Sequence, residues 1–180
     1  MSHSRPQKVL ISAEEIQSRV QELATQIASD FTGAPAVVVG ILNGAAPFMM
    51  DLLRLLPASV ASTLVYDFVD ATSYRGSEST GEVQLSHPLG VNIAEQEVLV
   101  VDGIVDTGAT LQTVLAVLKV KRPTSIRTCV LLDKVSRRKF DVPVDYRGFE
   151  IEDLFVVGYG MDFDGQFRGL RHVAVHSLST

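Results

Sequence analysis

The chain has 180 residues, of which 46% are hydrophobic and 21% charged, a composition typical of one globular domain with a substantial core. The net charge of -5 argues against a protein that coats nucleic acid, because such domains are usually basic. Residues Met1 to Lys8 contain no apolar stretch of signal-peptide length, and no later segment approaches the roughly 18 apolar residues of a membrane span. We therefore expect a cytoplasmic protein that binds neither membrane nor nucleic acid, with its one cysteine, Cys129, as a small buried hydrophobe.

The first part of the chain predicts a helix, a strand and a second helix. Ser12 to Glu15 has the form of a capping box, and apolar residues follow it at helical spacing until Gly33. The valine-rich run Ala36 to Leu42 is too short for a helix and predicts a strand that is buried on both faces. A second helix is predicted from Pro47 until Pro57 ends it.

Strands and helices continue to alternate in the remainder of the chain. Asp70 to Gly81 is rich in Ser, Thr and Gly and predicts a mobile loop, and Leu111 to Leu118 has helical periodicity. Strands are predicted at Thr63 to Val69, Glu97 to Val101, Ser125 to Leu132, Phe155 to Gly158 and His172 to His176. The alternation predicts an α/β protein with a mainly parallel central sheet flanked by helices, in which ligands bind at the carboxyl ends of the strands.

The segment Val98 to Leu111 joins a predicted strand to a predicted helix through acids, glycines and hydroxyl groups. Gly108 lets the backbone approach a ligand closely, and two threonines add hydroxyl donors beside the free N–H groups of a helix N-terminus, which favours a phosphate. The carboxylates of Asp102 and Asp106 can accept hydrogen bonds from sugar hydroxyls, bind Mg²⁺ or take a proton. For a lone Asp-Thr-Gly, a plain helix cap formed by Asp106 is the alternative interpretation.

The same segment resembles the signature of the type I phosphoribosyltransferases: four apolar residues, two acids, two apolar residues and then Asp-Thr/Ser-Gly-x-Thr. Gly103 replaces the second acid here, and Asp102 stands where the family commonly has glutamate. The resemblance implies the type I fold over residues 1–180, with a small hood built from the N-terminus and about residues 150–180. It implies that Asp106 is catalytic, and that the phosphoribosyl group is bound by Asp102, Gly103, Asp106, Thr107, Gly108, Ala109 and Thr110.

From about Val9 to Ser177 the chain is similar to the hypoxanthine-guanine phosphoribosyltransferases, with the motifs in the same order. Leu42-Asn43-Gly44 matches the loop that receives pyrophosphate, and the resemblance implies that its first peptide bond is cis. Many relatives have lysine where Asn43 stands. Arg168 matches an arginine that contacts pyrophosphate. Taken alone, an ordinary Asn-Gly turn is about as good an interpretation of the loop.

Ser73-Tyr74 matches the Ser-Tyr pair of the family's flexible catalytic loop. This match implies a lid over about residues 70–81 that closes over the sugar and excludes water from the reacting carbon. The lid gives a reason for a tyrosine in an otherwise hydrophilic loop. A surface loop of this length without a catalytic role is the alternative.

Four further residues match the purine site of the family. Lys134 would face the oxygen at purine position 6, because an ammonium only donates hydrogen bonds and suits a carbonyl better than the amino group of adenine. Phe155 would stack on the purine, and Val156 would offer it a main-chain carbonyl. Asp162 would lie near the base and, with Asp102, bind Mg²⁺. Taken singly, such a lysine is more often solvated and such a phenylalanine is more often a core residue.

The resemblance thus implies a purine salvage enzyme that transfers the 5-phosphoribosyl group from phosphoribosyl pyrophosphate to hypoxanthine or guanine, or to xanthine. It would yield IMP or GMP and pyrophosphate, use Mg²⁺, and assemble as a homodimer or homotetramer. A regulator that keeps the sugar-phosphate site without catalysis is a rival, which Asn43 and Gly103 favour and the acidic charge opposes. An orotate, adenine or uracil phosphoribosyltransferase is a second rival, which Lys134 opposes.

Overall fold

The computed structural model describes residues 8–31, 36–71 and 89–176. The prediction of a lid at Ser73-Tyr74 falls outside the described residues. In chain order the elements are β1 (Lys8–Ile11), α1 (Ala13–Asp30), β2 (Ala36–Leu42), α2 (Ala46–Leu55), α3 (Ala58–Ala61), β3 (Val65–Asp70), β4 (Glu97–Val105), α4 (Ala109–Val120), β5 (Ser125–Asp133), the 3-10 helix η1 (Val135–Arg137), β6 (Tyr146–Glu150), β7 (Val156–Val157) and β8 (Val173–Val175).

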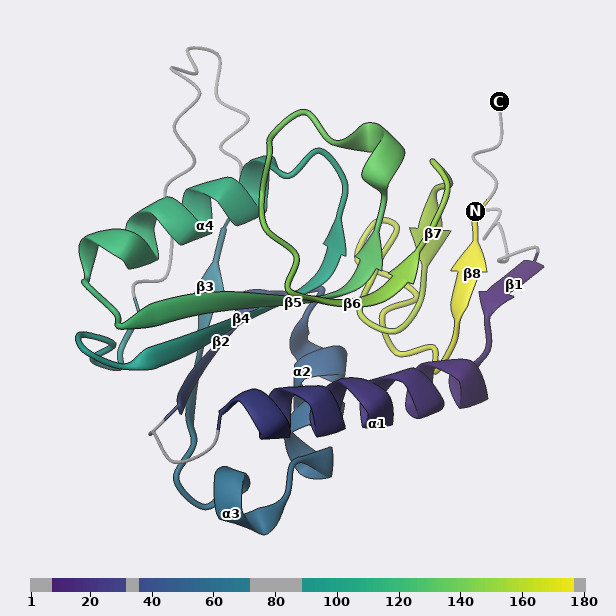
Figure 1. The fold of residues 1–180 in the computed structure, drawn as a ribbon. Helices are drawn as coiled ribbons and strands as arrows, with labels where there is room; N and C mark the ends of the chain where they lie inside the picture. The colour runs from purple at the N-terminus through teal and green to yellow at the C-terminus, as the bar shows by residue number, and fades with distance from the viewer. Residues whose placement is uncertain (1–7, 32–35, 72–88, 177–180) are drawn as a thin grey trace.

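The larger sheet contains five strands within the described residues, in the order β3-β2-β4-β5-β6, and every neighbouring pair is parallel. Helix α4 covers one face of this sheet, and α1 and α2 cover the other (Figure 1). The predicted α/β class is therefore confirmed. Because the strands run in one direction, the carboxyl ends of β2, β4 and β5 lie along one edge, where parallel sheets bind ligands.

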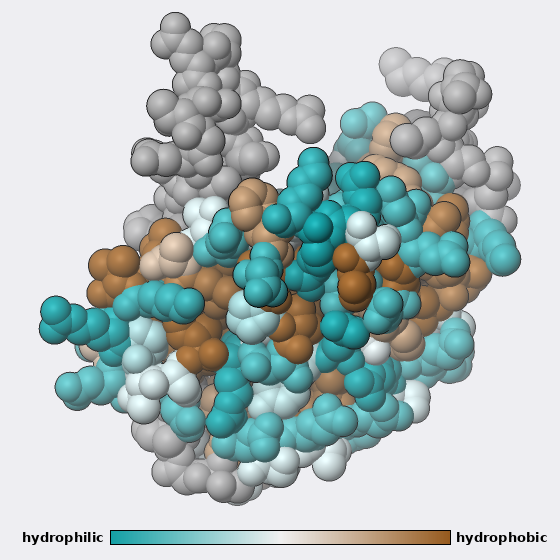
Figure 2. Space-filling model, turned by 45° about the horizontal axis from the view of Figure 1, so that its top comes forward, coloured by the Kyte–Doolittle hydropathy of each residue, from teal (hydrophilic) through white to brown (hydrophobic). Residues whose placement is uncertain are grey.

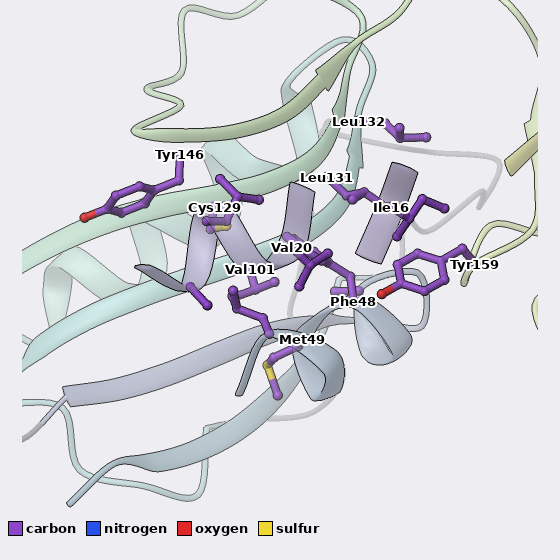
Figure 3. Packing of buried hydrophobic residues seen from close by; sticks show 14 of the residues in the cluster. Ile16, Val20, Phe48, Met49, Val101, Cys129, Leu131, Leu132, Tyr146 and Tyr159 are labelled. Atoms are coloured by element: carbon purple, nitrogen blue, oxygen red, sulfur yellow. The ribbon is translucent and has the colours of Figure 1, made fainter. Parts of the chain in front are cut away.

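Helix α1 begins at the predicted capping box. The Ser12 hydroxyl accepts a hydrogen bond from the Glu15 backbone N–H at 3.2 Å, and the Glu15 carboxylate accepts one from the Ser12 N–H at 2.8 Å. The buried residues of the helix recur every three or four positions and pack toward the sheet. Figure 3 shows two of them, Ile16 and Val20, close to Phe48 of α2 in the hydrophobic core.

Strand β4 is four residues longer than predicted, because it continues beyond Val101 to Val105. The cause is its pairing with β5. In the part of β4 beyond Val101, Asp102 lies opposite Val130 and Val105 lies opposite Asp133. A neighbouring strand thus satisfies backbone groups that follow the apolar run. As a result, two of the predicted phosphoribosyl residues, Asp102 and Gly103, lie inside a strand and not in a loop.

A second, smaller sheet joins the two ends of the described chain. Its three strands are antiparallel in the order β1-β8-β7, and it lies beside the end of the larger sheet at which β4 and β5 finish (Figure 1). Strands β7 and β8 fall within the two last predicted strands. Strands β1 and β6 were not predicted, and both lie at the edge of a sheet.

The described residues carry no helix that is long and apolar enough to cross a bilayer. On the face drawn in Figure 2, hydrophilic side chains are interspersed with smaller groups of hydrophobic ones. Cys129 is fully buried in β5, as predicted, and burial raises the pKa of its thiol above the ordinary value. The thiol is therefore a poor nucleophile.

Candidate active site

A cavity of about 370 Å³ lies between the carboxyl ends of the parallel strands and the segment around β7. Ten residues of the predicted site line it: Leu42, Gly44, Asp102, Asp106, Thr110, Lys134, Phe155, Val156, Asp162 and Arg168. They come from segments far apart in the sequence. The cavity therefore brings together residues predicted for the sugar phosphate, the purine and pyrophosphate.

The remaining predicted residues in the described part of the chain do not line this cavity: Asn43, Gly103, Thr107, Gly108 and Ala109. Four residues without a predicted role do line it: Ile41, Ala71, Ile104 and Met161. These four are apolar, and burial alone does not distinguish such residues from the core in a sequence.

Four charged side chains form a cluster at the rim of the cavity. The carboxylate oxygens of Asp106 lie 3.3 Å from Lys134 Nζ and 2.9 Å from Arg137 Nε. Asp153 faces the same two cations, at 3.6 Å from Lys134 Nζ and 3.4 Å from Arg137 Nη1. Lys134 is buried, with a side chain 7% exposed, whereas the other three are 41–53% exposed. Its charge is therefore balanced by two acids.

The helix-cap alternative for Asp106 does not hold in the structure. The N-cap of α4 is Gly108, which has a left-handed φ of 89° and no side chain with which to cap the helix. The Thr107 hydroxyl accepts a long hydrogen bond, 3.4 Å, from the Ala109 N–H. A glycine adopts this conformation without the steric cost that other residues meet. The N-terminus of α4 thus keeps free N–H groups, and Asp106 is directed to the cations instead.

The pKa of Asp106 lies below its ordinary value. Partial burial raises this pKa, but the hydrogen bond from Arg137 and the charge of Lys134 outweigh burial. The side chain is therefore a carboxylate near neutral pH, able to accept a hydrogen bond from a ligand. Its lowered pKa makes it a weaker base than a group matched to the operating pH.

Arg137 and Asp153 were not predicted as site residues. Arg137 follows Lys134 by three positions, and η1 places residues with this separation above one another. The spacing Lys-x-x-Arg after a strand is a signal that was available in the sequence. Asp153 lies in the segment before β7 and meets the cluster only through the fold, so no local pattern indicates it.

Asp102 is buried in β4 and lines the cavity. Burial raises its pKa to about 7, although the backbone N–H groups of Ile104 and Gly103 act in the opposite direction. With a pKa of about 7 the carboxyl is partly protonated near neutral pH, and a cation bound beside it would favour the ionised form. This is a useful property in a ligand of a divalent metal, which binds the ionised form.

Asp162 and Arg168 form an ion pair at the cavity wall, with 2.6 Å between Oδ1 and Nη2. The second carboxylate oxygen of Asp162 accepts a hydrogen bond from the Gly165 N–H at 2.8 Å. Arg168 also donates to the carbonyl oxygen of Gly160 at 2.6 Å. These contacts hold an acid and a guanidinium side by side in the part of the cavity predicted for pyrophosphate and metal.

Asp102 and Asp162 are two acids in the cavity that could bind Mg²⁺. Mg²⁺ commonly takes one or two carboxylates from a protein and completes its coordination with water and phosphate oxygens. Asp102 and Asp162 both line the cavity, while the described residues contain no cluster of three or more His, Cys, Asp or Glu that could hold a metal. The residues present therefore suit a cation shared with a phosphate ligand.

Phe155 presents an aromatic surface to the cavity. It is 42% exposed, and its ring meets those of Phe163 and His176 at centroid distances of 5.9 Å. Its carbonyl accepts a hydrogen bond from the His176 N–H at 2.9 Å. Two neighbouring rings thus contact Phe155 at an angle, and its partly exposed ring is suited to stacking on a flat ligand.

The loop after β2 carries the predicted pyrophosphate residues. The peptide bond between Leu42 and Asn43 is cis, as the resemblance implied. Gly44 lines the cavity, whereas Asn43 is exposed and does not. Gly103 lies behind this loop, where a Cβ atom would come within 2.7 Å of the Gly44 carbonyl oxygen.

Comparison with known proteins shows which family the chain resembles. The sequence model of the phosphoribosyl transferase domain family matches residues 12–164 of this chain. A hypoxanthine-guanine phosphoribosyltransferase of Staphylococcus aureus is 41% identical over 172 residues, covering 95% of this chain and 94% of that protein. A crystal structure of a hypoxanthine-guanine phosphoribosyltransferase from Bacillus anthracis has a TM-score of 0.87 at 38% identity, covering 96% of this chain and 98% of the other. For a hypoxanthine phosphoribosyl transferase of Trypanosoma cruzi the TM-score is 0.88 at 32% identity, with 98% and 94% covered.

The fold, the cavity and the matched domain define a phosphoribosyltransferase. Similarity over almost the whole of both chains narrows this class further. The chain belongs to the hypoxanthine-guanine phosphoribosyltransferase family.

Proposed function

We propose that this protein transfers the 5-phosphoribosyl group of phosphoribosyl pyrophosphate to hypoxanthine or guanine, with xanthine as a further candidate base. The products are IMP or GMP and pyrophosphate. One observation carries the proposal: a single cavity is lined by Asp106, Lys134, Phe155 and the Asp162–Arg168 pair. A site for a sugar phosphate alone needs neither a buried lysine nor an aromatic surface, and a purine has a use for both.

The 5-phosphate of the sugar binds at the N-terminus of α4 in this proposal. The left-handed Gly108 ends the turn after Asp106 and has no side chain to cap the helix, so that only the long bond from the Ala109 N–H to the Thr107 hydroxyl engages the first N–H groups of α4. Free N–H groups and the positive end of the helix dipole favour a phosphate. Thr110 is exposed in the first turn of α4 and adds a hydroxyl at the cavity.

Pyrophosphate leaves from the opposite part of the cavity. Arg168 and the backbone of Leu42-Asn43-Gly44 would donate hydrogen bonds to its oxygens, and Asp102 and Asp162 would hold Mg²⁺. Bound Mg²⁺ would neutralise charge on the leaving group. Arg168 is already held by Asp162 and by the Gly160 carbonyl, so it needs little reordering to face an anion.

In the transfer, N9 of the purine forms a bond to the anomeric carbon, and the bond from that carbon to the pyrophosphate oxygen breaks with its electron pair. The proton on N7 is hydrogen-bonded by Asp106 and passes to it or, through it, to solvent. Because Arg137 and Lys134 keep the pKa of Asp106 low, its main contribution is the hydrogen bond and its negative charge near the developing positive charge on the sugar.

Lys134 selects 6-oxopurines. Its ammonium lies 3.3 Å from Asp106, which places a donor close to the group that faces N7. A carbonyl oxygen at position 6 accepts from this donor, whereas the amino group of adenine would meet it as a second donor. Phe155 stacks on the ring, and the main-chain carbonyl of Val156 accepts from the base.

The small sheet β1-β8-β7 acts as a hood over the base in this proposal, because β7 carries part of the cavity wall. We further propose that the protein assembles as a homodimer or homotetramer. Light scattering of the purified protein at several concentrations tests the assembly, and a monomer at all of them would contradict it.

The reaction is tested by incubating the purified protein with phosphoribosyl pyrophosphate, Mg²⁺ and one base at a time, and separating the nucleotides by chromatography. We expect IMP from hypoxanthine and GMP from guanine, and little product from adenine, uracil or orotate. Product from adenine or a pyrimidine in preference to the 6-oxopurines would overturn the assignment. Absence of product from every base would favour a regulator that only binds the sugar phosphate.

A further inference from the structure

One backbone atom, the carbonyl oxygen of Gly44, is approached from two sides by glycines. A Cβ atom on Gly103 would lie 2.7 Å from this oxygen and 2.9 Å from its carbonyl carbon. A Cβ atom on Gly160 would lie closer still to the same oxygen, and 3.1 Å from the same carbon. Contacts this short are incompatible with a side chain, so the Gly44 carbonyl occupies a space that exists only because both neighbours lack one.

The two glycines belong to different parts of the fold and to different parts of the cavity wall. Gly103 lies in β4 and its N–H hydrogen-bonds the carboxyl of Asp102. Gly160 follows β7, and Arg168 contacts it twice: its N–H donates to the Arg168 carbonyl at 3.0 Å, and its own carbonyl accepts from the guanidinium at 2.6 Å. The Gly44 carbonyl therefore lies between the strand that carries Asp102 and the loop that carries Arg168.

We propose that Gly103 and Gly160 are positioning residues for the pyrophosphate subsite, and that they act by holding the Gly44 carbonyl between them. This inference rests on the proposed function for the identity of the ligand. Neither glycine reaches pyrophosphate. Together they set where the loop after β2 stands relative to Asp102 on one side and to Arg168 on the other.

The contact also gives a physical reason for the glycine at position 103, where the type I signature has an acid. Any side chain there would displace the Gly44 backbone or the strand, because the obstructing atoms are main-chain atoms and not the end of a flexible side chain. The space that a carboxylate would need is filled by the loop. Gly103 is thus a requirement of the packing in this chain.

The test compares Gly103→Ala with Gly169→Ala. Both positions avoid the left-handed backbone, but a Cβ atom on the exposed Gly169 meets nothing within 4 Å. Calorimetry with inorganic pyrophosphate and Mg²⁺ measures the subsite directly, and calorimetry with GMP measures the sugar-phosphate and purine sites. A displacement of about 1 Å at an active site can cost as much as a hundredfold, so we expect pyrophosphate binding to weaken about 10- to 100-fold in Gly103→Ala. GMP affinity should change less than about twofold, and Gly169→Ala should match the wild type in both.

Gly160→Ala supplies a second variant, including the case in which Gly103→Ala does not fold. If both glycines act through the Gly44 carbonyl, the double variant should lose less pyrophosphate affinity than the product of the two single losses. Three results would each overturn the inference. Gly103→Ala could bind pyrophosphate as tightly as the wild type, or it could lose pyrophosphate and GMP affinity equally. The losses of the two single variants could also multiply in the double variant. Failure to form nucleotide despite tight pyrophosphate binding would contradict the proposed function alone, whereas a wild type that does not bind pyrophosphate would contradict this inference.

Discussion

The buried carboxyl of Asp102 makes the stability of the ligand-free protein depend on pH. Burial raises its pKa to about 7, from the ordinary value of 3.8 that the unfolded chain keeps. Between these two values the folded state holds a proton that the unfolded state has lost. The free energy of unfolding must therefore fall as pH rises, and the contribution of protonated Asp102 is lost as pH passes 7.

The size of the effect follows from the pKa difference. The difference between about 7 and 3.8 is about 3 units, and each unit corresponds to about 1.4 kcal/mol, so the full effect is about 4 kcal/mol. Most experiments cover only part of this range. From about pH 5.5 to about pH 8 the folded state loses one proton near pH 7, which corresponds to a loss of about 2 kcal/mol.

We expect Asp102→Asn to remove this pH dependence, because asparagine resembles the protonated acid and does not titrate. Urea unfolding without ligand or Mg²⁺, at about pH 5.5 and about pH 8, gives the two free energies for each variant. The wild type should lose about 2 kcal/mol more than Asp102→Asn over this interval. Asp106→Asn is the matched control, since the lowered pKa of Asp106 leaves that group ionised at both values. Equal pH dependence in the wild type and Asp102→Asn would show that the Asp102 carboxyl is already ionised in the folded state.

Three further variants test the charged cluster at the rim of the cavity. Asp106→Asn should lower turnover by a factor of about 10² to 10⁴, while calorimetry still detects phosphoribosyl pyrophosphate binding; near-normal turnover would remove Asp106 from the chemistry. Lys134→Ala should reduce the use of hypoxanthine and weaken discrimination against adenine, measured as the ratio of kcat/KM for the two bases; an unchanged ratio would place Lys134 outside base recognition. Arg137→Gln removes one hydrogen bond to Asp106 in a partly exposed site, so kcat should fall by about tenfold at most. Lys121→Gln, which also replaces one cation by glutamine but at the far end of α4, should leave kcat unaltered.

The elements that were predicted well are those whose signals are local. The capping box at Ser12 and Glu15 places the start of α1, because the two residues that form it are three positions apart. The apolar run of β2 has the same bounds in the structure as in the prediction, since a strand buried on both faces requires an unbroken apolar sequence. Such features depend little on the rest of the chain.

The strands that were missed or misjudged depend on a partner strand. β1 has four residues, of which two are exposed, and pairs with β8 from the other end of the chain. β6 has a glycine at its centre and pairs with β5 at the edge of the larger sheet. The end of β4 was placed four residues early, because Asp102 and Gly103 interrupt its apolar run and the residues after Val101 are held by β5. Their strand structure is fixed by contacts that no local pattern contains.

The candidate site divides in the same way. Asp106, Lys134, Phe155 and Asp162 follow strands or stand in recognisable motifs, and all four line one cavity. The contact of Asp106 with two cations could not be predicted, because it joins the end of β4 to η1 across a parallel pair of strands. This contact changes the chemistry assigned to Asp106, since it lowers the pKa of the group proposed as a base.

Gly103 marks the limit of transferring a motif residue by residue. In the sequence it reads as a lost carboxylate, which leaves Asp102 alone to meet the ribose or the metal. In the structure the Gly44 backbone fills the space that a side chain at position 103 would need, so the loop after β2 packs against β4 at this point. A second acid beside Asp102 would also add a like charge next to a carboxyl whose pKa burial already raises to about 7, and would oppose its ionisation further. The glycine therefore favours both the packing of the pyrophosphate loop and the ionisation of the one remaining acid.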